Sequence, residues 1–276
     1  MYQVLDKYTI EMEIIPQIPI ANRGPKISVP IVELINCILY KLKTGAQWEF
    51  LPVSSLFSNN VLDPKTVFGH YRNWCKKDVW KESWISLLSK YTSKLDLSSS
   101  DLDGSHTTAL KGGQEVGYQG RKKRKTTNAL YLTDRQGLPI AMSEPISGNH
   151  NDLFDIEVHF EEVTATLEQA EISLDGLFLN VDPGFDSLEL RQQCDAKGII
   201  ANFKENKRNN KKCTNDHYFD EQLYKERYAI ERTNAWIDSF RTLLNRFDTT
   251  TSSWKGFNYL AFMVMGIRKF QKINSR

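Results

Sequence analysis

The stretch LFLNVDPGFDSLELRQQCDAKGIIANFK, residues 177–204, contains a strand–helix–strand pattern. Residues 177–182 form a short apolar run typical of a buried strand, and residues 187–198 have a helical composition that ends at Gly198. A second strand-like run follows at residues 198–204. Alternation of strand and helix is typical of an α/β sheet.

The segments on either side of this stretch extend the same pattern. Strand-like runs lead into Asp103 and cover residues 127–134 and 138–146, and the last two are separated by turn residues 135–137. Helices are expected at residues 152–169, capped by residues 149–151, and at residues 221–244. The sequence therefore predicts a mixed α/β sheet flanked by helices on both faces.

The first 95 residues have a different pattern, because their apolar positions recur at helical spacing. One stripe comprises Ile31, Leu34, Ile35, Ile38, Leu39 and Leu42. Gly45 is expected to end this helix, and Asp63-Pro64 to begin the next. Lys65 and Arg72 on that helix resemble the basic residues of a helix-turn-helix DNA reader. The tryptophans at 48, 74, 80 and 84 are more typical of a core than of a base-stacking surface. We predict a helical DNA-binding domain at residues 1–95 and a catalytic domain at 96–276.

Composition excludes several classes of protein. Apolar residues make up 40% of the 276 residues, as in ordinary globular proteins. The four cysteines form no C-x-x-C pair, which argues against a disulfide scaffold or a zinc module. The N-terminal residues lack the pattern of a signal peptide, and the apolar run at 257–267 is shorter than a membrane span and indicates a buried helix. These features favour the reducing cytoplasm and no membrane association.

Charge is segregated along the chain although the net charge is only +2. Residues 151–200 contain 2 Lys and Arg against 12 Asp and Glu, whereas residues 201–276 contain 15 against 8. Such segregation suits a protein that holds an anionic polymer with basic flanks, and ordinary solvated surface charge is the alternative.

Three carboxylates lie where a fold would hold them rigidly. Asp103 and Asp182 lie at or near the ends of strand-like runs, and Glu231 lies on a predicted helix. Mg²⁺ takes oxygen ligands, and two such ions about 4 Å apart clamp the attacking and leaving oxygens of a phosphoryl displacement. The three residues therefore predict a metal site that acts on a phosphodiester.

The predicted helix at 221–244 brings further polar residues to the face that carries Glu231. Tyr224, Arg227, Glu231 and Asp238 fall within one sector of about 60° on a helical projection. In such a site Arg227 and Tyr224 contact a DNA phosphate. An ordinary ion pair between Arg227 and Glu231 on an exposed face remains the alternative.

The spacing Y-x₂-R-x₃-E of Tyr224, Arg227 and Glu231 resembles the signature of the DDE transposases of bacterial insertion sequences. Asp103-Gly104-Ser105 and the motif DPGFD at residues 182–186 resemble the two aspartate motifs of that family. The segments ILYKLKTGAQWEFLP, VFGHYRNWCKKDVW and GNHNDLFD extend the similarity over nearly the whole chain. The resemblance implies an RNase H-like catalytic domain and metal-dependent DNA cleavage and strand transfer.

The same resemblance implies the cofactors and partners. Asp103, Asp182 and Glu231 would hold two Mg²⁺ or Mn²⁺ ions. The partners would be double-stranded DNA, comprising the terminal inverted repeats of the element and its target, and a second copy of the chain on that DNA. The implied location is the bacterial cytoplasm at the nucleoid. The sequence departs from the family at Asp238, where the signature has a lysine that grips a DNA phosphate; Arg241 and Arg246 are the nearby candidates to replace it.

Basic clusters give further candidates for DNA contact. Residues 121–125 form one run, which includes Lys122, Lys123 and Arg124, and Lys204 begins a second cluster with Lys207, Arg208, Lys211 and Lys212. A plain solvated loop is the alternative for these runs. His106 lies close to Asp103 but is more typical of a structural histidine than of a ligand or base.

Two other functions remain open at this stage. An RNase H-like nuclease or resolvase would cut DNA without rejoining it, and a catalytically decayed relative would bind DNA without cutting it. Strand-transfer products distinguish the first from a transposase, and metal-dependent nicking distinguishes the second.

Overall fold

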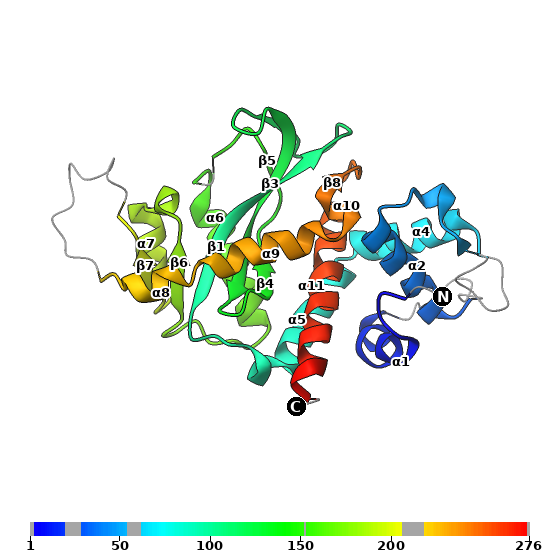
Figure 1. Cartoon of the computed structure of the whole chain (residues 1–276), viewed down its shortest axis with the longest axis horizontal. Helices are drawn as coiled ribbons and strands as arrows, with labels where there is room; N and C mark the ends of the chain where they lie inside the picture. The colour runs from blue at the N-terminus through cyan, green and yellow to red at the C-terminus, as the bar shows by residue number, and fades with distance from the viewer. Residues whose placement is uncertain (1–2, 20–28, 54–61, 152, 206–217, 275–276) are drawn as a thin grey trace. The chain divides into compact units, whose positions relative to one another are not determined.

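The computed structural model describes residues 3–19, 29–53, 62–151, 153–205 and 218–274 (Figure 1). Their elements, in chain order, are α1 (Lys7–Thr9), η1 (Ile10–Ile14), η2 (Ile15–Gln17), α2 (Ile31–Thr44), η3 (Trp48–Phe50), α4 (Pro64–Lys76), α5 (Val79–Lys90), η4 (Thr92–Lys94), β1 (Ser100–Ala109), β2 (Gly117–Gln119), β3 (Arg124–Asp134), β4 (Pro139–Met142), β5 (Ile146–Ser147), α6 (Ile156–Gln169), β6 (Phe178–Val181), η5 (Pro183–Phe185), α7 (Leu188–Ala196), β7 (Ile200–Phe203), α8 (Glu221–Lys225), α9 (Tyr228–Asp238), α10 (Arg241–Leu244), β8 (Asn245–Arg246) and α11 (Thr251–Asn274).

The chain separates into two compact units. The helical unit comprises Met1–Lys90, Leu110–Gln114 and Ile237–Arg276, and the sheet unit comprises Tyr91–Ala109 and Glu115–Trp236. No helix of the described residues is both long and apolar enough to cross a membrane.

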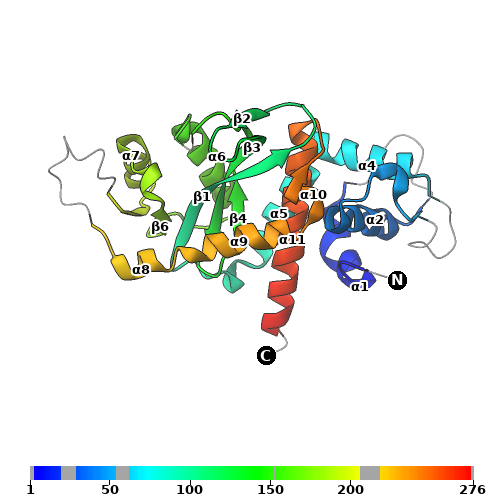
Figure 2. The ribbon, with the colours of Figure 1, turned by 45° about the horizontal axis from the view of Figure 1, so that its top comes forward.

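The sheet unit is organised around β1. This strand pairs antiparallel with β3 and parallel with β6, and β6 pairs parallel with β7. The strand order is β2-β3-β1-β6-β7, and β4 and β5 also pair with β3. Figures 1 and 2 show α9 crossing one face of this sheet and α6 lying on the other. The predicted mixed sheet with helices on both faces is confirmed.

The helical unit confirms the local signals of the sequence. In α2, the side chains of Leu34, Ile38 and Leu42 are fully buried, and Gly45 ends the helix in a left-handed conformation with φ of 70°. The α4 helix begins at Pro64 because the side chain of Asp63 accepts a hydrogen bond from the Lys65 backbone N–H. Trp74, Trp80 and Trp84 are buried and Trp48 is half-buried, as predicted for a core.

The C-terminal helix α11 belongs to the helical unit, whereas the sequence placed residues 237–276 with the catalytic domain. It packs against α4 and α5, where the Phe257 ring stacks on Tyr71 at 4.4 Å and the Tyr71 hydroxyl donates to the Ser253 carbonyl. The apolar run at 257–267 is thus a buried helix, as predicted. Whether the functional boundaries follow residues 1–95 and 96–276 stays a prediction.

The helix before β6 begins later than its sequence indicates. Residues 152–169 were expected to be helical, but α6 begins at Ile156 after Asp155, whose φ of 46° is left-handed. Residue 152 lies outside the described part of the chain. The reason for the late start is a turn at the end of β5, in which the His150 N–H donates to the Ser147 carbonyl and the His150 ring stacks on Phe154.

Candidate active site

Asp103 lies at the point where β1 leaves its parallel partner. The pairing of β1 with β6 ends at Leu102 and Val181, whereas the pairing with β3 continues to Thr108. Asp103 is therefore inside β1. The strand predicted before it continues to Ala109, because the antiparallel pairing with β3 is longer than the parallel pairing with β6. The Asp103 carboxylate is half-buried and accepts a hydrogen bond from the Gly104 N–H at 2.9 Å.

Asp182 follows β6 directly and adjoins Asp103. Each residue comes one position after the last β1–β6 pair, so the two carboxylates lie at the same end of adjacent parallel strands. One oxygen of Asp182 caps the turn of η5 by accepting the Gly184 N–H. The other oxygen lies 3.5 Å from the guanidinium of Arg227.

Arg227 lies against Asp182, and Tyr224 lies beside Arg227. The Arg227 side chain is 18% exposed and its guanidinium carbon lies 5.9 Å from the centre of the Tyr224 ring. The ammonium of Lys204 lies 5.8 Å from the same ring. Burial raises the pKa of Tyr224, and the charge of Asp182 acts in the same direction while Arg227 opposes it. The phenol therefore stays protonated and can donate a hydrogen bond to a phosphate.

Glu231 lies on the exposed side of α9. The opposite side of that helix is anchored to the β3–β4 turn, where the Thr233 hydroxyl donates to the Gly137 carbonyl at 2.5 Å and Ala229 and Ile230 are buried. No group of three His, Cys, Asp or Glu side chains in the described residues is arranged to hold a metal ion. Mg²⁺ takes oxygen ligands, so the carboxylates of Asp103 and Asp182 are of a suitable type. Their role as metal ligands, and the approach of Glu231 to them, stay predictions.

Gly137 should be required for the close packing of α9 on the β3–β4 turn. Its φ is +81°, and a Cβ at this position would lie 2.9 Å from the Ala229 carbonyl oxygen. We expect Gly137→Ala to lower the free energy of unfolding by about 1–3 kcal/mol and to speed amide hydrogen exchange in α9. Gly176→Ala is the control, because Gly176 has a similar φ of +78° but nothing lies within 4 Å of its would-be Cβ. Equal exchange in α9 of the two variants would refute the role of the close contact.

The segment that carries Tyr224, Arg227 and Glu231 is not the single helix predicted at residues 221–244. It breaks into α8, α9 and α10, with turns at 226–227 and 239–240. Glu226 is clamped at the first break by Arg135 of the β3–β4 turn, with nitrogen–oxygen distances of 2.7 and 2.9 Å. Tyr224 and Arg227 therefore precede α9 and do not share one continuous helical face with Glu231.

The sequence analysis missed a buried polar row next to the two aspartates. Asn180 donates its side-chain N–H to the Asp101 carboxylate at 2.9 Å and accepts one from Asn202 at 2.8 Å. Burial raises the pKa of Asp101 to about 6, although the hydrogen bond from Asn180 and the charge of Arg227 lower it. The available signal was a polar residue two positions before each aspartate, and for Asn180 its place in a strand that is otherwise apolar.

The basic run at 121–125 is exposed: residues 121–123 lie in the β2–β3 turn, and Arg124 and Lys125 begin β3. Lys122, Lys123 and Arg124 thus stand at the end of β3, which pairs with Asp103 at Tyr131. Seven residues of strand separate Arg124 from Tyr131, or roughly 24 Å. Contact of these residues with DNA stays a prediction.

His106 contacts polar groups of two neighbouring strands. Its ring nitrogens lie 3.1 Å from the Thr126 hydroxyl and 3.3 Å from the side-chain nitrogen of Gln119, and its carbonyl accepts from the Lys122 ammonium. The histidine thus ties β1 to β2 and β3.

The remaining basic candidates differ in exposure. Lys65 and Arg72 are exposed on α4 of the helical unit, and Lys204 is exposed after β7, but Lys207, Arg208, Lys211 and Lys212 lie outside the described residues. Of the two candidates to replace the signature lysine, Arg241 is exposed, whereas Arg246 is buried beside Trp254 and donates to the Asp248 carbonyl. Arg246 is therefore unsuitable for DNA contact. Asp238 itself is exposed.

A second feature that the sequence analysis missed is an aromatic and cationic stripe on α9. The Arg232 guanidinium lies 5.1 Å from the Tyr228 ring and 5.7 Å from the Trp236 ring. Trp236 is 44% exposed, whereas the other five tryptophans are half-buried or buried. The available signal in the sequence was that Tyr228, Arg232 and Trp236 are spaced by four residues, which places them on one side of a helix.

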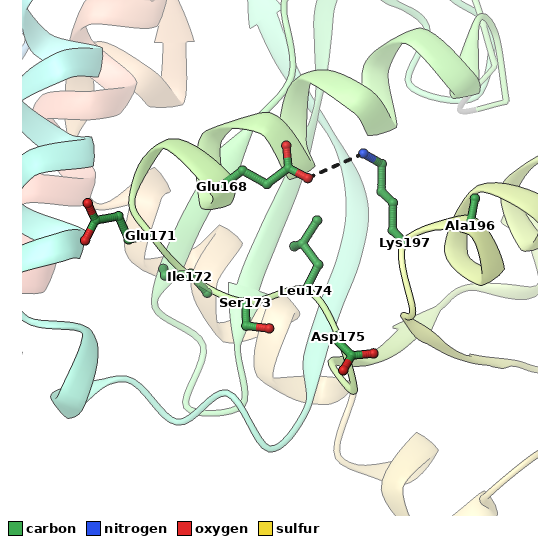
Figure 3. A pocket seen from close by; sticks show the side chains of 8 residues that line it. All are labelled: Glu168, Glu171, Ile172, Ser173, Leu174, Asp175, Ala196 and Lys197. Atoms are coloured by element: carbon green, nitrogen blue, oxygen red, sulfur yellow. Dashed lines mark ion pairs between the residues drawn. The ribbon is translucent and has the colours of Figure 1, made fainter.

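A hollow of about 650 Å³ lies at the other end of β6 from Asp182 (Figure 3). Glu168, Asp175 and Lys197 are among the residues that line it, and the Lys197 ammonium lies 3.7 Å from the Glu168 carboxylate. Because β6 separates this hollow from Asp182, it is not part of the candidate active site.

Comparison with known proteins gives one family. A search of curated protein sequences finds no match. Among solved structures, the Mos1 strand transfer complex matches 91% of this chain and 78% of its own, with 13% identity and a TM-score of 0.34. The Mos1 transposase paired-end complex with the left transposon end matches 91% of this chain and 81% of its own, with 12% identity and a TM-score of 0.30. Residues 94–264 match the model of the transposase DDE domain. Because that match spans more than half of the chain, this protein belongs to the DDE-domain transposases.

Proposed function

We propose that this chain is a transposase that cleaves DNA at the ends of an insertion sequence and transfers the cut strand to target DNA. Asp103, Asp182 and Glu231 are the proposed carboxylates, and two Mg²⁺ or Mn²⁺ ions the proposed cofactors. The observation that supports this most is the position of Asp103 and Asp182 at the same end of adjacent parallel strands. Two such metal ions activate the attacking oxygen and stabilise the leaving oxygen in phosphoryl transfer.

Arg227 has two roles in this proposal. Without DNA it neutralises Asp182, from which it is separated by 3.5 Å. With DNA bound, the planar guanidinium contacts a phosphate oxygen beside the scissile bond, together with the protonated Tyr224 hydroxyl. The cation holds the DNA while the carboxylates position the reacting phosphorus. Lys65, Arg72, Lys122, Lys123 and Arg124 are the proposed contacts to more distant phosphates.

Two copies of the chain would pair the two ends of the element, in the bacterial cytoplasm at the nucleoid. A size measurement by mass photometry on DNA carrying one end should then show two chains and two DNA fragments in one complex. A complex of one chain with one fragment would contradict the dimer.

A strand-transfer assay tests the function as a whole. The probe is the genomic DNA that flanks the reading frame, supplied as a pre-cut fragment with a free 3′-hydroxyl, together with a supercoiled plasmid and Mn²⁺. A transposase joins the fragment to the plasmid. Nicking without joining would identify a nuclease, and metal-independent binding without nicks would identify a decayed DNA-binding protein.

Arg124 gives a separate test of DNA binding. Its side chain is exposed, so Arg124→Ala removes a charge without disturbing the core. We expect the slope of log affinity against log salt to fall by about 0.9, the value for one phosphate contact, equally for specific and random DNA. Filter binding between about 50 and 200 mM salt measures the slope. An unchanged slope would remove Arg124 from the interface.

A further inference from the structure

A continuous row of buried polar side chains crosses three strands of the sheet. The pairing registers place Asp101 beside Asn180 and Asn180 beside Asn202. Asn180 and Asn202 are 0% exposed and Asp101 is 2% exposed. Since a carboxylate only accepts hydrogen bonds, Asn180 donates to Asp101 and its own oxygen accepts from Asn202. The row therefore has a fixed donor and acceptor direction.

The last member of the row holds the start of α8, the helix that carries Tyr224 and ends two residues before Arg227. The Asn202 side chain donates to the Asp220 carbonyl at 3.0 Å and accepts from the Asp220 N–H at 2.7 Å. The Asp220 carboxylate then caps α8 by accepting the N–H groups of Gln222 and Leu223, both at 2.9 Å. Asn202 thus grips the backbone of Asp220 as a neighbouring strand would.

In each of the two strands that lead to a candidate carboxylate, one member of this row lies two residues before that carboxylate. Asp101 precedes Asp103 by two residues, and Asn180 precedes Asp182 by two. Alternate residues of a strand lie on one face, so each member shares its face with the candidate carboxylate that follows. The row connects β1, β6, β7 and the start of α8, which are the segments that bring Asp103, Asp182 and Arg227 together.

Stability alone does not explain a polar row at this place. Apolar side chains of similar volume would avoid the desolvation of a carboxylate and two amides, and such replacements are often neutral or stabilising. A polar row instead fixes alignment, because a one-residue shift of β6 would leave its buried groups unpaired. We propose that Asp101, Asn180 and Asn202 are positioning residues that set the spacing between Asp103, Asp182 and the start of α8. This inference rests on the proposed function.

A donor–acceptor swap tests the row. In Asn180→Asp, two carboxylates face each other where the hydrogen bond was, so the row breaks. In the double variant D101N/N180D, the carboxylate now on β6 would accept from both amide neighbours, so every hydrogen bond of the row is restored with the same total charge. Loss of a residue that orients a metal ligand typically changes metal affinity about 10- to 100-fold, and the row would act in this way through the backbone of β1 and β6. We expect N180D to raise the Mn²⁺ concentration for half-maximal cleavage at least about tenfold. In D101N/N180D this concentration should fall most of the way back to the wild-type value.

Two measurements separate positioning from a loss of folding. Electron paramagnetic resonance of free Mn²⁺ measures metal binding without turnover, and amide hydrogen exchange at Gln222 and Leu223 measures the seating of α8. Ser100→Ala is the matched control, because its buried hydroxyl donates to the Phe178 carbonyl between the same two strands but is not part of the row. It should lower the melting temperature without changing the Mn²⁺ requirement or the exchange.

The outcomes are distinct. Failure of the double variant to recover, or an equal effect of S100A on the Mn²⁺ requirement, would overturn the positioning role. If the wild type neither binds Mn²⁺ nor cleaves DNA, the proposed function fails, and the exchange at α8 in N180D and the double variant still decides whether the row positions that helix.

Discussion

Replacement of Asp103 by alanine should reduce DNA cleavage and strand transfer by roughly 10³-fold or more, while affinity for the element end stays within about twofold. The carboxylate lies where β1 leaves β6 and next to Asp182, so its loss removes a proposed metal ligand that no neighbouring carboxylate of β1 replaces: Asp101 is buried in the polar row. A gel assay with end-labelled DNA and Mn²⁺ measures cleavage, and the same DNA without metal measures binding.

Asp103→Asn separates charge from structure in this experiment. In the wild type the Gly104 N–H donates to the Asp103 carboxylate at 2.9 Å. The asparagine side chain has nearly the same volume, and its amide oxygen can accept the same hydrogen bond. This variant should therefore fold as the wild type does and be nearly as inactive as the alanine variant. Asp195→Asn, at an exposed carboxylate on α7, serves as the control and should retain full activity. Near-normal cleavage by either Asp103 variant would rule out Asp103 as a catalytic residue.

The second large effect is expected in the helical unit, where Phe257→Ala should lower the free energy of unfolding by about 3–5 kcal/mol. The Phe257 ring is completely buried, stacks on Tyr71 at 4.4 Å and lies 6.1 Å from the Trp48 ring. Its removal leaves a cavity between α11 and α4, two helices that are far apart in the sequence.

Tryptophan fluorescence during urea unfolding measures this effect selectively, because five of the six tryptophans are in the helical unit. Phe247→Ala is the control at a 51% exposed ring of the same unit and should change stability by no more than about 0.5 kcal/mol. A loss below about 1 kcal/mol for Phe257→Ala would show that α11 does not complete the helical core.

Much of this fold follows from local patterns. The stripe of α2, the cap of α4 at Asp63 and the apolar strand β6 were predicted because each depends on residues close together in the sequence. The candidate carboxylates were found because motif spacing and strand position can be read directly. The family resemblance was confirmed by the match of residues 94–264.

Features that depend on distant contacts were not predictable in the same way. The break between α8 and α9 occurs without Gly or Pro, because Asn202 holds Asp220 and Arg135 clamps Glu226 from other parts of the sheet unit. The packing of α11 with the helical unit likewise depends on Tyr71, which lies 182 residues before its hydrogen-bond partner Ser253. The polar row required the pairing registers of three strands.

The order of strand pairing has a consequence for synthesis on the ribosome. β1 pairs with β3 through a short connection, but its parallel partner β6 begins only at Phe178. The hairpin of β1 and β3 can form while the other edge of β1 is still open, and an open edge accepts strands from other chains. Nascent copies on crowded polysomes are therefore exposed to aggregation until β6 emerges, and a chaperone that covers this edge should raise the soluble yield.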